Sequence, residues 1–392
     1  MFPKEIIKAL CKRAGVEVKR IPSGKDILRN VYGSTSRKRA LLSYITSPYL
    51  EPESLGHTNR IECRAAGDIL HELGYQVDVV DFYADSSIRY EDYEVIYGMG
   101  RNLEKSFACS KPMRRIYYAT GACTIFSNME TLRKSRAFHG RSGMFALGSV
   151  RYTAMSQDAQ HLLSDRVIVL GNAFTKGTYL RFDADDSRYS NLDAFFYRTY
   201  TPDIKGKDFG EARRHFIWFG SSGLLHKGLD TAIDVFLRRR DLFLHICGAN
   251  KGEAEFFKFY GPLIAGAGNI TDHGFIDIQS EEFRRLMDTC AFAIYPSVSE
   301  GGAPALLTVM GNGGLIPLAC ESVGLDMHPE IGYVRANDSG GYLEAIEKLS
   351  SMDDEELRTL SGQIMRDTCR RYTIGNYRKS LKVIIKNSLN ES

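Results

Sequence analysis

The sequence lacks long apolar runs, paired cysteines and segments of biased composition. No apolar run approaches the roughly 20 residues that span a bilayer, and the chain does not open with the charged and then apolar regions of a secretory signal. Its eight cysteines contain no C-x-x-C pair, which excludes the common zinc sites and disulfide frameworks. We therefore expect a globular protein of the reducing cytosol.

The composition that is present is that of an ordinary globular protein. Of the 392 residues, 43% are hydrophobic and 25% are charged, which excludes disorder, a collagen-like structure and a coiled coil. The length exceeds what one compact core holds and fits two domains of roughly 150–200 residues each.

Positive charge is concentrated at the start of the chain. The first 40 residues carry eleven Lys or Arg and three acidic residues, whereas the net charge of the whole chain is +3. We treat residues 1–39 as a basic N-terminal extension. Within residues 1–20, Phe2, Ile6 and Leu10 recur at helical spacing, which predicts either contact with an anionic membrane surface or packing on the protein's own domain. No nucleic-acid partner is expected, because no binding motif accompanies the charge.

From residue 40 onward, continuous apolar runs alternate with stretches of helical period. This pattern is typical of parallel strands covered by helices on both faces. It extends over residues 40–205, gives way to a polar linker over 199–214 and resumes over 211–373, and a last helix is expected over 374–392. The expected strands are 40–45, 77–82, 94–97, 115–118, 167–170, 215–219, 242–246 and 291–295. The expected helices are 60–73, 228–238, 252–260, 280–289, 304–311 and 353–370.

Two consecutive α/β halves predict two doubly wound domains that face a cleft. Ligands in such folds bind beyond the carboxyl ends of the strands. The functional site is therefore expected between the two halves.

The turn after the last expected strand is the most informative segment. It leads into a helix beginning near Pro304, where proline is well tolerated. The amides of Gly301, Gly302 and Ala303 would form an anion site at the helix N-terminus, and Glu300 beside them would accept hydrogen bonds from hydroxyl groups. An anion next to hydroxyl groups describes a sugar phosphate. The alternative interpretation is a tight corner with a surface glutamate.

This turn resembles the signature loop of a large enzyme family. Pro296-Ser297, Glu300-Gly301, Met310 and Gly313 stand in register with the family pattern P-S-x-x-E-G-F-G-L-P and the A-M-A-x-G-x-P that follows it. The family is that of the retaining glycosyltransferases with a GT-B fold (family 4-like, group 1), which includes sucrose-phosphate synthase and bacterial glycogen synthase.

The resemblance extends to three more loops of the second half. Residues 219–230 are similar to the family's G-R-x-x-x-x-K-G loop, and Cys247-Gly248 and 274–276 resemble its base-binding loops. The likeness covers about residues 213–375. Over the N-terminal half it is architectural only.

The resemblance implies an α/β protein of GT-B fold, with two Rossmann-like domains facing a central cleft. The domain over 40–205 would bind the acceptor, the domain over 211–373 would bind a nucleotide-sugar donor, and the helix over 374–392 would cross back to the first domain. Lys227 would pair with the donor diphosphate and Glu300 would bind sugar hydroxyls, so these two are the expected catalytic residues. The implied donor-binding residues are Gly220, Ser221, Ser222, Lys227, Gly248, Phe275, Ile276, Glu300, Gly301, Gly302, Ala303 and Thr308.

Two departures from the family pattern affect the donor site. The family's second glutamate, which accepts from the ribose hydroxyls, falls on Thr308. The arginine that follows the first glycine of the family loop is absent, and Ser221 or Ser222 occupies its place. Without that charge, Lys227 would have to supply more of the binding to the diphosphate. A catalytically weak protein is therefore an alternative.

The first half offers only weak candidates for the acceptor side of the cleft. Loops that follow expected strands contain Gly56, His57, Thr58 and Thr120, and His139 lies downstream. The catalytic-loop histidine of many relatives has no counterpart that aligns. An ordinary capped loop is the alternative interpretation of residues 55–60.

One motif competes with this assignment. Asp183 and Asp185 match the metal-binding D-x-D of the other glycosyltransferase fold, but they lie in a charged segment between Arg181 and Arg188, which favours a solvated turn over a metal site. No metal or other cofactor is expected.

The sequence thus predicts a hexosyltransferase-type glycosyltransferase (EC 2.4). It would move a sugar from a nucleotide diphosphate to a sugar, glycolipid or other hydroxyl acceptor with retention of configuration, in bacterial polysaccharide or glycolipid assembly. The expected location is the cytoplasm, with peripheral contact at the inner face of the membrane left open. The alternatives are a sugar-nucleotide-binding protein with weak or no catalysis, an inverting GT-B transferase, and an epimerase or hydrolase.

Overall fold

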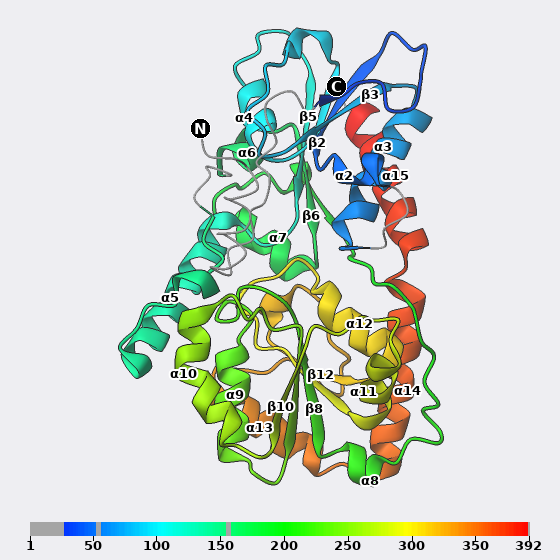
Figure 1. The fold of residues 1–392 in the computed structure, drawn as a ribbon. Helices are drawn as coiled ribbons and strands as arrows, with labels where there is room; N and C mark the ends of the chain where they lie inside the picture. The colour runs from blue at the N-terminus through cyan, green and yellow to red at the C-terminus, as the bar shows by residue number, and fades with distance from the viewer. Residues whose placement is uncertain (1–26, 52–55, 154–157, 391–392) are drawn as a thin grey trace, which may run out of the picture.

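The computed structural model of the chain describes residues 27–51, 56–153 and 158–390, which form two lobes stacked end to end (Figure 1). Each lobe has a mainly parallel sheet with helices on both faces, as the alternation of strands and helices predicts. The basic segment over residues 1–20 lies outside the described residues.

The N-terminal lobe is built on a seven-stranded sheet in the order β1-β3-β2-β4-β5-β6-β7, parallel except at β1. Its strands are apolar runs because helices cover both faces, and β3 buries Val77, Val79 and Val80 completely. The strands are β1 (Ile27–Leu28), β2 (Arg39–Tyr44), β3 (Gln76–Asp81), β4 (Val95–Gly98), β5 (Arg114–Ala119), β6 (Arg166–Leu170) and β7 (Tyr189–Leu192). The helices are α2 (Ser47–Leu50), α3 (Asn59–Glu72), α4 (Arg101–Ser106), α5 (Thr124–Ser142), α6 (Asp158–Leu163) and α7 (Ala173–Leu180).

The first sheet begins before residue 40, where the sequence placed the start of the domain. Strand β1 pairs antiparallel with β3. Arg29 and Arg39, two basic residues of the predicted extension, bind the buried carboxylate of Asp78 at 2.8 and 2.7 Å. These charges therefore belong to the lobe itself rather than to a free basic segment.

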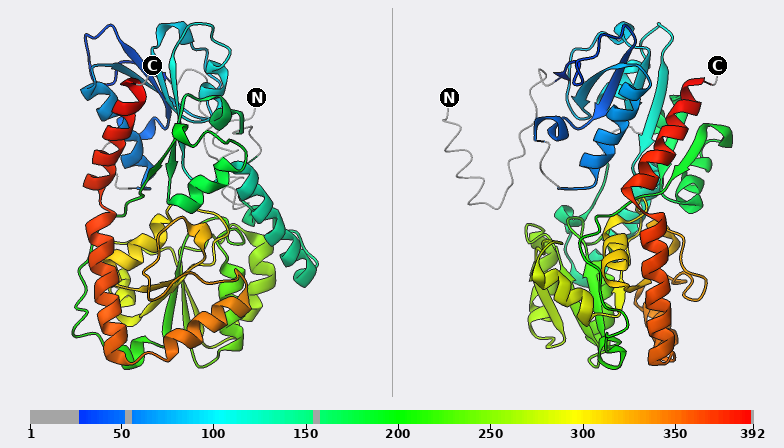
Figure 2. Two further views of the ribbon diagram at one scale, coloured as in Figure 1. Left: turned by 180° about the vertical axis from the view of Figure 1, so that it is seen from behind. Right: turned by 90° about the vertical axis from the view of Figure 1, so that its right-hand side faces the viewer.

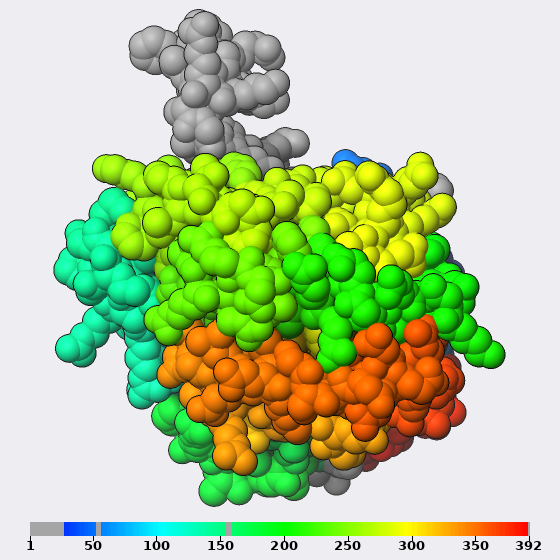
Figure 3. Space-filling view, turned by 90° about the horizontal axis from the view of Figure 1, so that it is seen from below, coloured from blue at the N-terminus to red at the C-terminus, as the bar shows by residue number. Residues whose placement is uncertain are grey.

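The C-terminal lobe contains a five-stranded parallel sheet in the order β10-β9-β8-β11-β12. Its strands are β8 (His215–Phe219), β9 (Phe243–Cys247), β10 (Ile270–Gly274), β11 (Phe292–Ile294) and β12 (Ile316–Leu318). Its helices are α8 (Phe209–Ala212), α9 (Leu229–Arg238), α10 (Ala254–Ala265), α11 (Glu281–Thr289), α12 (Pro304–Gly313), α13 (Ser339–Ser350) and α14 (Asp354–Arg371). Helices α13 and α14 cover much of the lower face (Figure 3).

Helix α5 belongs to the first lobe in sequence but lies along the second (Figures 1 and 2). Phe138 stacks on Phe256 of α10 with ring centroids 6.4 Å apart, and Lys134 binds Asp230 of α9 at 3.1 Å. The sequence does not predict this helix, because its buried positions include Thr131 and other polar residues and form no apolar stripe.

The chain ends by returning to the first lobe. Helix α15 (Ile374–Asn390) follows α14 and packs against α3. Helices α14 and α15 form one column along the edge of both lobes (Figure 2). Arg378 binds Asp68 of α3 at 2.7 Å, and the Tyr377 hydroxyl lies 3.0 Å from that of Tyr118. The lobes are therefore joined both by the linker and by this second crossing.

The part of the chain that the structure describes contains no membrane-spanning helix and no disulfide. Within residues 27–51, 56–153 and 158–390, no helix combines the length and apolarity needed to cross a bilayer. No disulfide joins the cysteines of those same ranges.

Candidate functional site

A cleft of about 1000 Å³ lies between the two lobes. Loops at the carboxyl ends of strands from both sheets line it, which is where ligands bind in open α/β folds. The predicted residues that line this cleft are Gly56, His57, Thr58, Thr120, Gly220, Ser221, Lys227, Gly248, Phe275, Ile276, Glu300, Gly301 and Thr308.

The turn that joins β11 to α12 is held in a conformation that leaves its amides available. Gly302 (φ +74°) and Ala303 (φ +37°) both adopt left-handed backbone, which is costly for alanine, and Pro304 then begins α12. No acceptor for the N–H groups of residues 301–303 lies among the described residues. The N-terminus of α12 therefore presents free donors, as an anion site requires.

Lys227 and Glu300 meet inside the cleft. The Nζ of Lys227 lies 3.3 Å from Oε1 of Glu300, and both side chains are 9% exposed. Burial lowers the pKa of Lys227, and the charge of Glu300 opposes that shift. Burial alone would raise the pKa of Glu300, but the positive charges of Lys227 and Arg151 outweigh it and hold the pKa at about 2. The Glu300 carboxylate is therefore ionised at neutral pH, and its negative charge favours the protonated form of the neighbouring Lys227.

Two hydroxyl groups complete this pair. Tyr295 and Ser297 donate to Oε1 of Glu300 at 3.1 and 2.8 Å, and Lys227 also donates to the Tyr295 hydroxyl at 2.9 Å. All three donors meet the same carboxylate oxygen. Oε2 of Glu300 has no donor among the described residues, so it can accept a hydrogen bond from a ligand hydroxyl.

His226 links this turn to the first lobe, a role that the sequence does not indicate. Its Nε2 lies 2.7 Å from the Ser299 carbonyl and its Nδ1 lies 2.7 Å from the Thr131 hydroxyl of α5. Burial lowers the pKa of His226 to about 4. The ring is therefore neutral, with Nε2–H donating to Ser299 and Nδ1 accepting from Thr131.

The predicted base-binding residues divide between surface and core. The Phe275 ring is 87% exposed at the cleft, whereas Ile276 is buried. The hydroxyl of Thr308 donates to the Pro304 carbonyl at 2.8 Å, so it can only accept a hydrogen bond from a ligand. Ser222, predicted at this site, lies outside the cleft lining and accepts from Asn250 at 3.0 Å.

Three further predicted residues do not line the cleft. Gly302 and Ala303 are not among the residues that line it, and a Cβ on Gly302 would lie 2.8 Å from Cβ of Ala194. The prediction of His139 is wrong. This residue lies in the last turn of α5, outside the cleft, and its ring stacks on that of Phe145 beyond the end of the helix. Fifteen residues of helix place it about 22 Å from the start of α5.

The N-terminal side of the cleft is rich in aromatic rings and contains one buried acid. Glu62 of α3 accepts from the hydroxyls of Tyr44 at 2.7 Å and Tyr118 at 3.1 Å. Burial raises the pKa of Glu62 despite these bonds. No sequence pattern indicated this group, because Tyr44, Glu62 and Tyr118 come from separate strands and helices. The aromatic residues of this side are Tyr44, Phe82, Tyr83, Tyr117, Tyr179 and Tyr197.

Cationic side chains are few in the cleft. Among the described residues that line it, only Lys227 and Arg151 carry positive charge. His57 is also present, but burial, followed by the charges of Lys227 and Arg151, lowers its pKa. Arg151 was not predicted from the sequence, although the missing arginine of the family loop was a signal to search for another cation.

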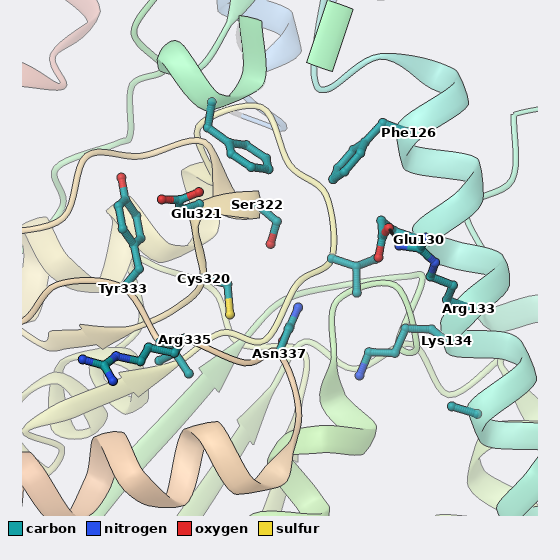
Figure 4. Close-up of a pocket in the computed structure, with 14 residues that line it drawn as sticks. Phe126, Glu130, Arg133, Lys134, Cys320, Glu321, Ser322, Tyr333, Arg335 and Asn337 are labelled. Atoms are coloured by element: carbon teal, nitrogen blue, oxygen red, sulfur yellow. Dashed lines mark hydrogen bonds and ion pairs between the residues drawn. The ribbon is translucent and has the colours of Figure 1, made fainter. Parts of the chain in front are cut away.

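A second cavity, of about 630 Å³, adjoins the same turn through Val298 (Figure 4). One wall is α5, with Phe126, Glu130, Arg133 and Lys134, and the other is the segment 320–337. Its cations are largely paired, since Arg133 binds Glu130 and Lys134 binds Asp230. None of the predicted site residues lines it, so the larger cleft is the candidate site.

The D-x-D motif forms a local turn. Asp183 accepts from Arg188 and from the Tyr189 hydroxyl, and Asp185 accepts from the Ser187 amide at 3.2 Å. Both carboxylates stabilise the backbone that leads into β7.

Comparison with known proteins identifies the fold. No protein-family model and no curated protein sequence matches the chain. The structure is similar to HepE from Anabaena, solved with UDP and glucose (13% identity, TM-score 0.57, 90% of this chain and 100% of that one). It is similar to a glycosyltransferase from Rickettsia africae (10% identity, TM-score 0.59, 91% of this chain and 100% of that one). It is also similar to the lipopolysaccharide outer core galactosyltransferase WaaB (13% identity, TM-score 0.52, 89% of this chain and 99% of that one). The chain has the GT-B fold, as predicted.

Proposed function

We propose that the protein is a glycosyltransferase that moves a sugar from a nucleotide diphosphate to a hydroxyl acceptor. The observation that carries the proposal is the convergence, in one interlobe cleft, of the Lys227–Glu300 pair with the unpartnered amide of Gly301 at the start of α12. A cation and free amides suit a diphosphate, and a carboxylate oxygen without a donor suits a sugar hydroxyl.

The donor would lie along the C-terminal wall of the cleft. Its diphosphate would contact Lys227 and the turn amides, its sugar would meet Oε2 of Glu300, and its base would lie beside Phe275 and Ile276. The structures solved for HepE contain UDP, UDP-glucose or UDP with glucose, which favours a uridine nucleotide and a hexose as the first donor to test.

Transfer with retention is the chemistry that we propose, and it requires no protein nucleophile. The diphosphate would leave as Lys227 and the amides stabilise its developing charge, and a departing phosphate oxygen would take the proton of the acceptor hydroxyl. In this scheme the protein cations do what a metal ion does in other transferases, so no metal is needed. An inverting reaction would instead need a general base, for which neutral His57 is the candidate at the cleft.

The aromatic N-terminal wall would bind the acceptor. Aromatic rings pack against the apolar faces of sugars, and the buried Glu62 group supplies hydroxyls and a carboxyl for orientation. We propose a sugar or glycolipid acceptor of polysaccharide assembly, which is consistent with the structural similarity to WaaB, a galactosyltransferase of the lipopolysaccharide outer core.

A thermal-shift series tests the proposed function. A ligand that binds only the folded state raises the unfolding midpoint, so we expect UDP or GDP to raise it and the free nucleoside to have less effect. Lys227→Ala should abolish the shift, while Arg136→Ala, an exposed charge on α5 away from the cleft, should preserve it. If neither nucleotide shifts the midpoint of the wild-type protein, the proposed function is wrong. Binding without release of UDP from any sugar donor would favour the binding-protein alternative.

Peripheral membrane contact through residues 1–20 is a separate part of the proposal. The basic, amphipathic sequence of that segment carries it. Sedimentation with anionic liposomes should capture the full chain and lose the variant that lacks residues 1–20. Equal capture of the full chain and of the truncated variant would show that residues 1–20 do not bind the membrane.

A further inference from the structure

Arg151 reaches the donor side of the cleft from the opposite lobe. It follows the short 3-10 helix η2 (Leu147–Ser149), which packs against α10 of the C-terminal lobe. Its side chain lies over the loop after β8, because a Cβ on Gly223 would be 2.5 Å from Cγ and 2.6 Å from Cδ of Arg151. The stem thus rests on the loop that contains the predicted phosphate-binding serines.

Lys227 and His226 together supply too little positive charge to balance a bound diphosphate. Lys227 is already paired with Glu300 at 3.3 Å, so together they contribute no net charge. Buried His226, with a pKa of about 4, is neutral at pH 7. A nucleoside diphosphate therefore requires a cation other than Lys227 to balance its charge.

Arg151 is available for that role. Among the described residues, no carboxylate lies within ion-pair distance of its guanidinium, and its side chain is exposed at the cleft. Its charge reaches the centre of the site, since it lowers the pKa of Glu300 together with Lys227. A guanidinium can bind two phosphate oxygens at once, which an ammonium cannot.

The segment that bears Arg151 is fixed to the lobe that would hold the donor. Helix α5 is tied to α9 by Lys134 and by Arg141, which bind Asp230 at 3.1 and 2.7 Å. Phe138 packs on α10. Arg151 therefore keeps its place beside the Gly220–Gly223 loop through direct contacts with the second lobe.

Resting on the proposed function, we propose that Arg151 is the second phosphate-binding cation of the donor site, supplied by the N-terminal half of the chain. It takes the place that an arginine after Gly220 would otherwise fill. Because it comes from the acceptor side, it would also join the two lobes through the bound diphosphate.

Calorimetric titration with UDP, UMP and uridine tests this role. Arg151→Ala should weaken UDP binding at least about tenfold, weaken UMP binding less and leave uridine binding unchanged, and it should lower the dependence of UDP affinity on salt. Arg151→Lys should give an intermediate loss, because it keeps the charge and loses the two-point contact. Arg136→Ala, the matched removal of one exposed positive charge from α5, should bind as the wild type does.

The outcomes separate this inference from the proposed function. Wild-type UDP affinity in Arg151→Ala overturns the role of Arg151 and leaves the proposed function standing. Equal losses for UDP and uridine overturn it as well, because they indicate a structural role. If the wild-type chain binds neither UDP nor GDP, the proposed function fails, and this inference fails with it.

Discussion

Lys227 and Glu300 lie 73 residues apart in the chain, yet the lysine Nζ is 3.3 Å from the glutamate Oε1 in the cleft. Each charge offsets part of the desolvation cost of the other. The two groups therefore form a pair without net charge. A donor diphosphate would draw Lys227 from Glu300 and leave the carboxylate for the sugar.

Glu300→Gln separates binding from transfer. The amide keeps the shape of the side chain and releases the Lys227 charge, so UDP affinity should stay equal or rise. Transfer from a UDP-sugar should fall by about 10²–10³, because the hydroxyl acceptor at Oε2 is weakened. Titration with UDP measures the affinity, and an assay of released UDP measures the transfer. Parallel losses of affinity and transfer would contradict this division of roles.

Stability should fall as the solution is acidified from pH 7.5 to 5. The folded pKa of His226 is about 4 and its ordinary value is 6.5, so the folded chain binds fewer protons between these values. The contribution of neutral His226 is complete above pH 6.5 and is lost as the pH falls toward 4, with a loss of ~2 kcal/mol by pH 5. Urea unfolding at both pH values measures it. His226→Gln should show a smaller drop, and an identical drop would assign the effect elsewhere.

Gly302→Ala should disrupt the turn. The position combines a φ of +74° with a Cβ contact of 2.8 Å to Ala194, so the free energy of unfolding should fall by about 1–3 kcal/mol. Gly140→Ala is the matched control, because Gly140 lies in α5 with nothing within 4 Å of its Cβ position. That variant should gain about 0.5–1 kcal/mol. Equal urea midpoints for the two variants would contradict the left-handed conformation at Gly302.

The crossing helix α15 should contribute to the stability of the first lobe. Leu381 is fully buried, so Leu381→Ala should cost about 2–5 kcal/mol in urea unfolding. Val383, two residues away and 54% exposed, provides the control, and Val383→Ala should change stability by less than about 0.5 kcal/mol. Similar small effects from both variants would mean that α15 is not packed against α3 in solution.

The anomeric outcome of the reaction decides between retention and inversion. We expect the product to keep the configuration of the donor, because the cleft would then need no general base. Proton NMR of the freshly formed glycoside, before mutarotation or further transfer, measures the anomeric coupling. An inverted product would direct attention to His57, and His57→Gln would then be expected to abolish transfer.

The strands could be predicted from the sequence because a buried parallel strand is a local apolar run. Expected strands such as 215–219 and 167–170 agree with β8 and β6 to within a residue. Helix α5 and strand β1 were missed. The first has few apolar positions, and the second contains two residues, Ile27 and Leu28, that form a strand only because β3 lies beside them.

The sequence by itself determined the local parts of the site: the turn after β11 with its free amides, and the position of Lys227 at the start of α9. Only the tertiary structure decided which charges act together. Strands β6, β7 and β8 and the interlobe linker separate Arg151 from Lys227 in the chain, and Thr131 lies 95 residues from His226. No short-range pattern encodes such contacts, because they form only when the two lobes pack and α5 docks across the boundary.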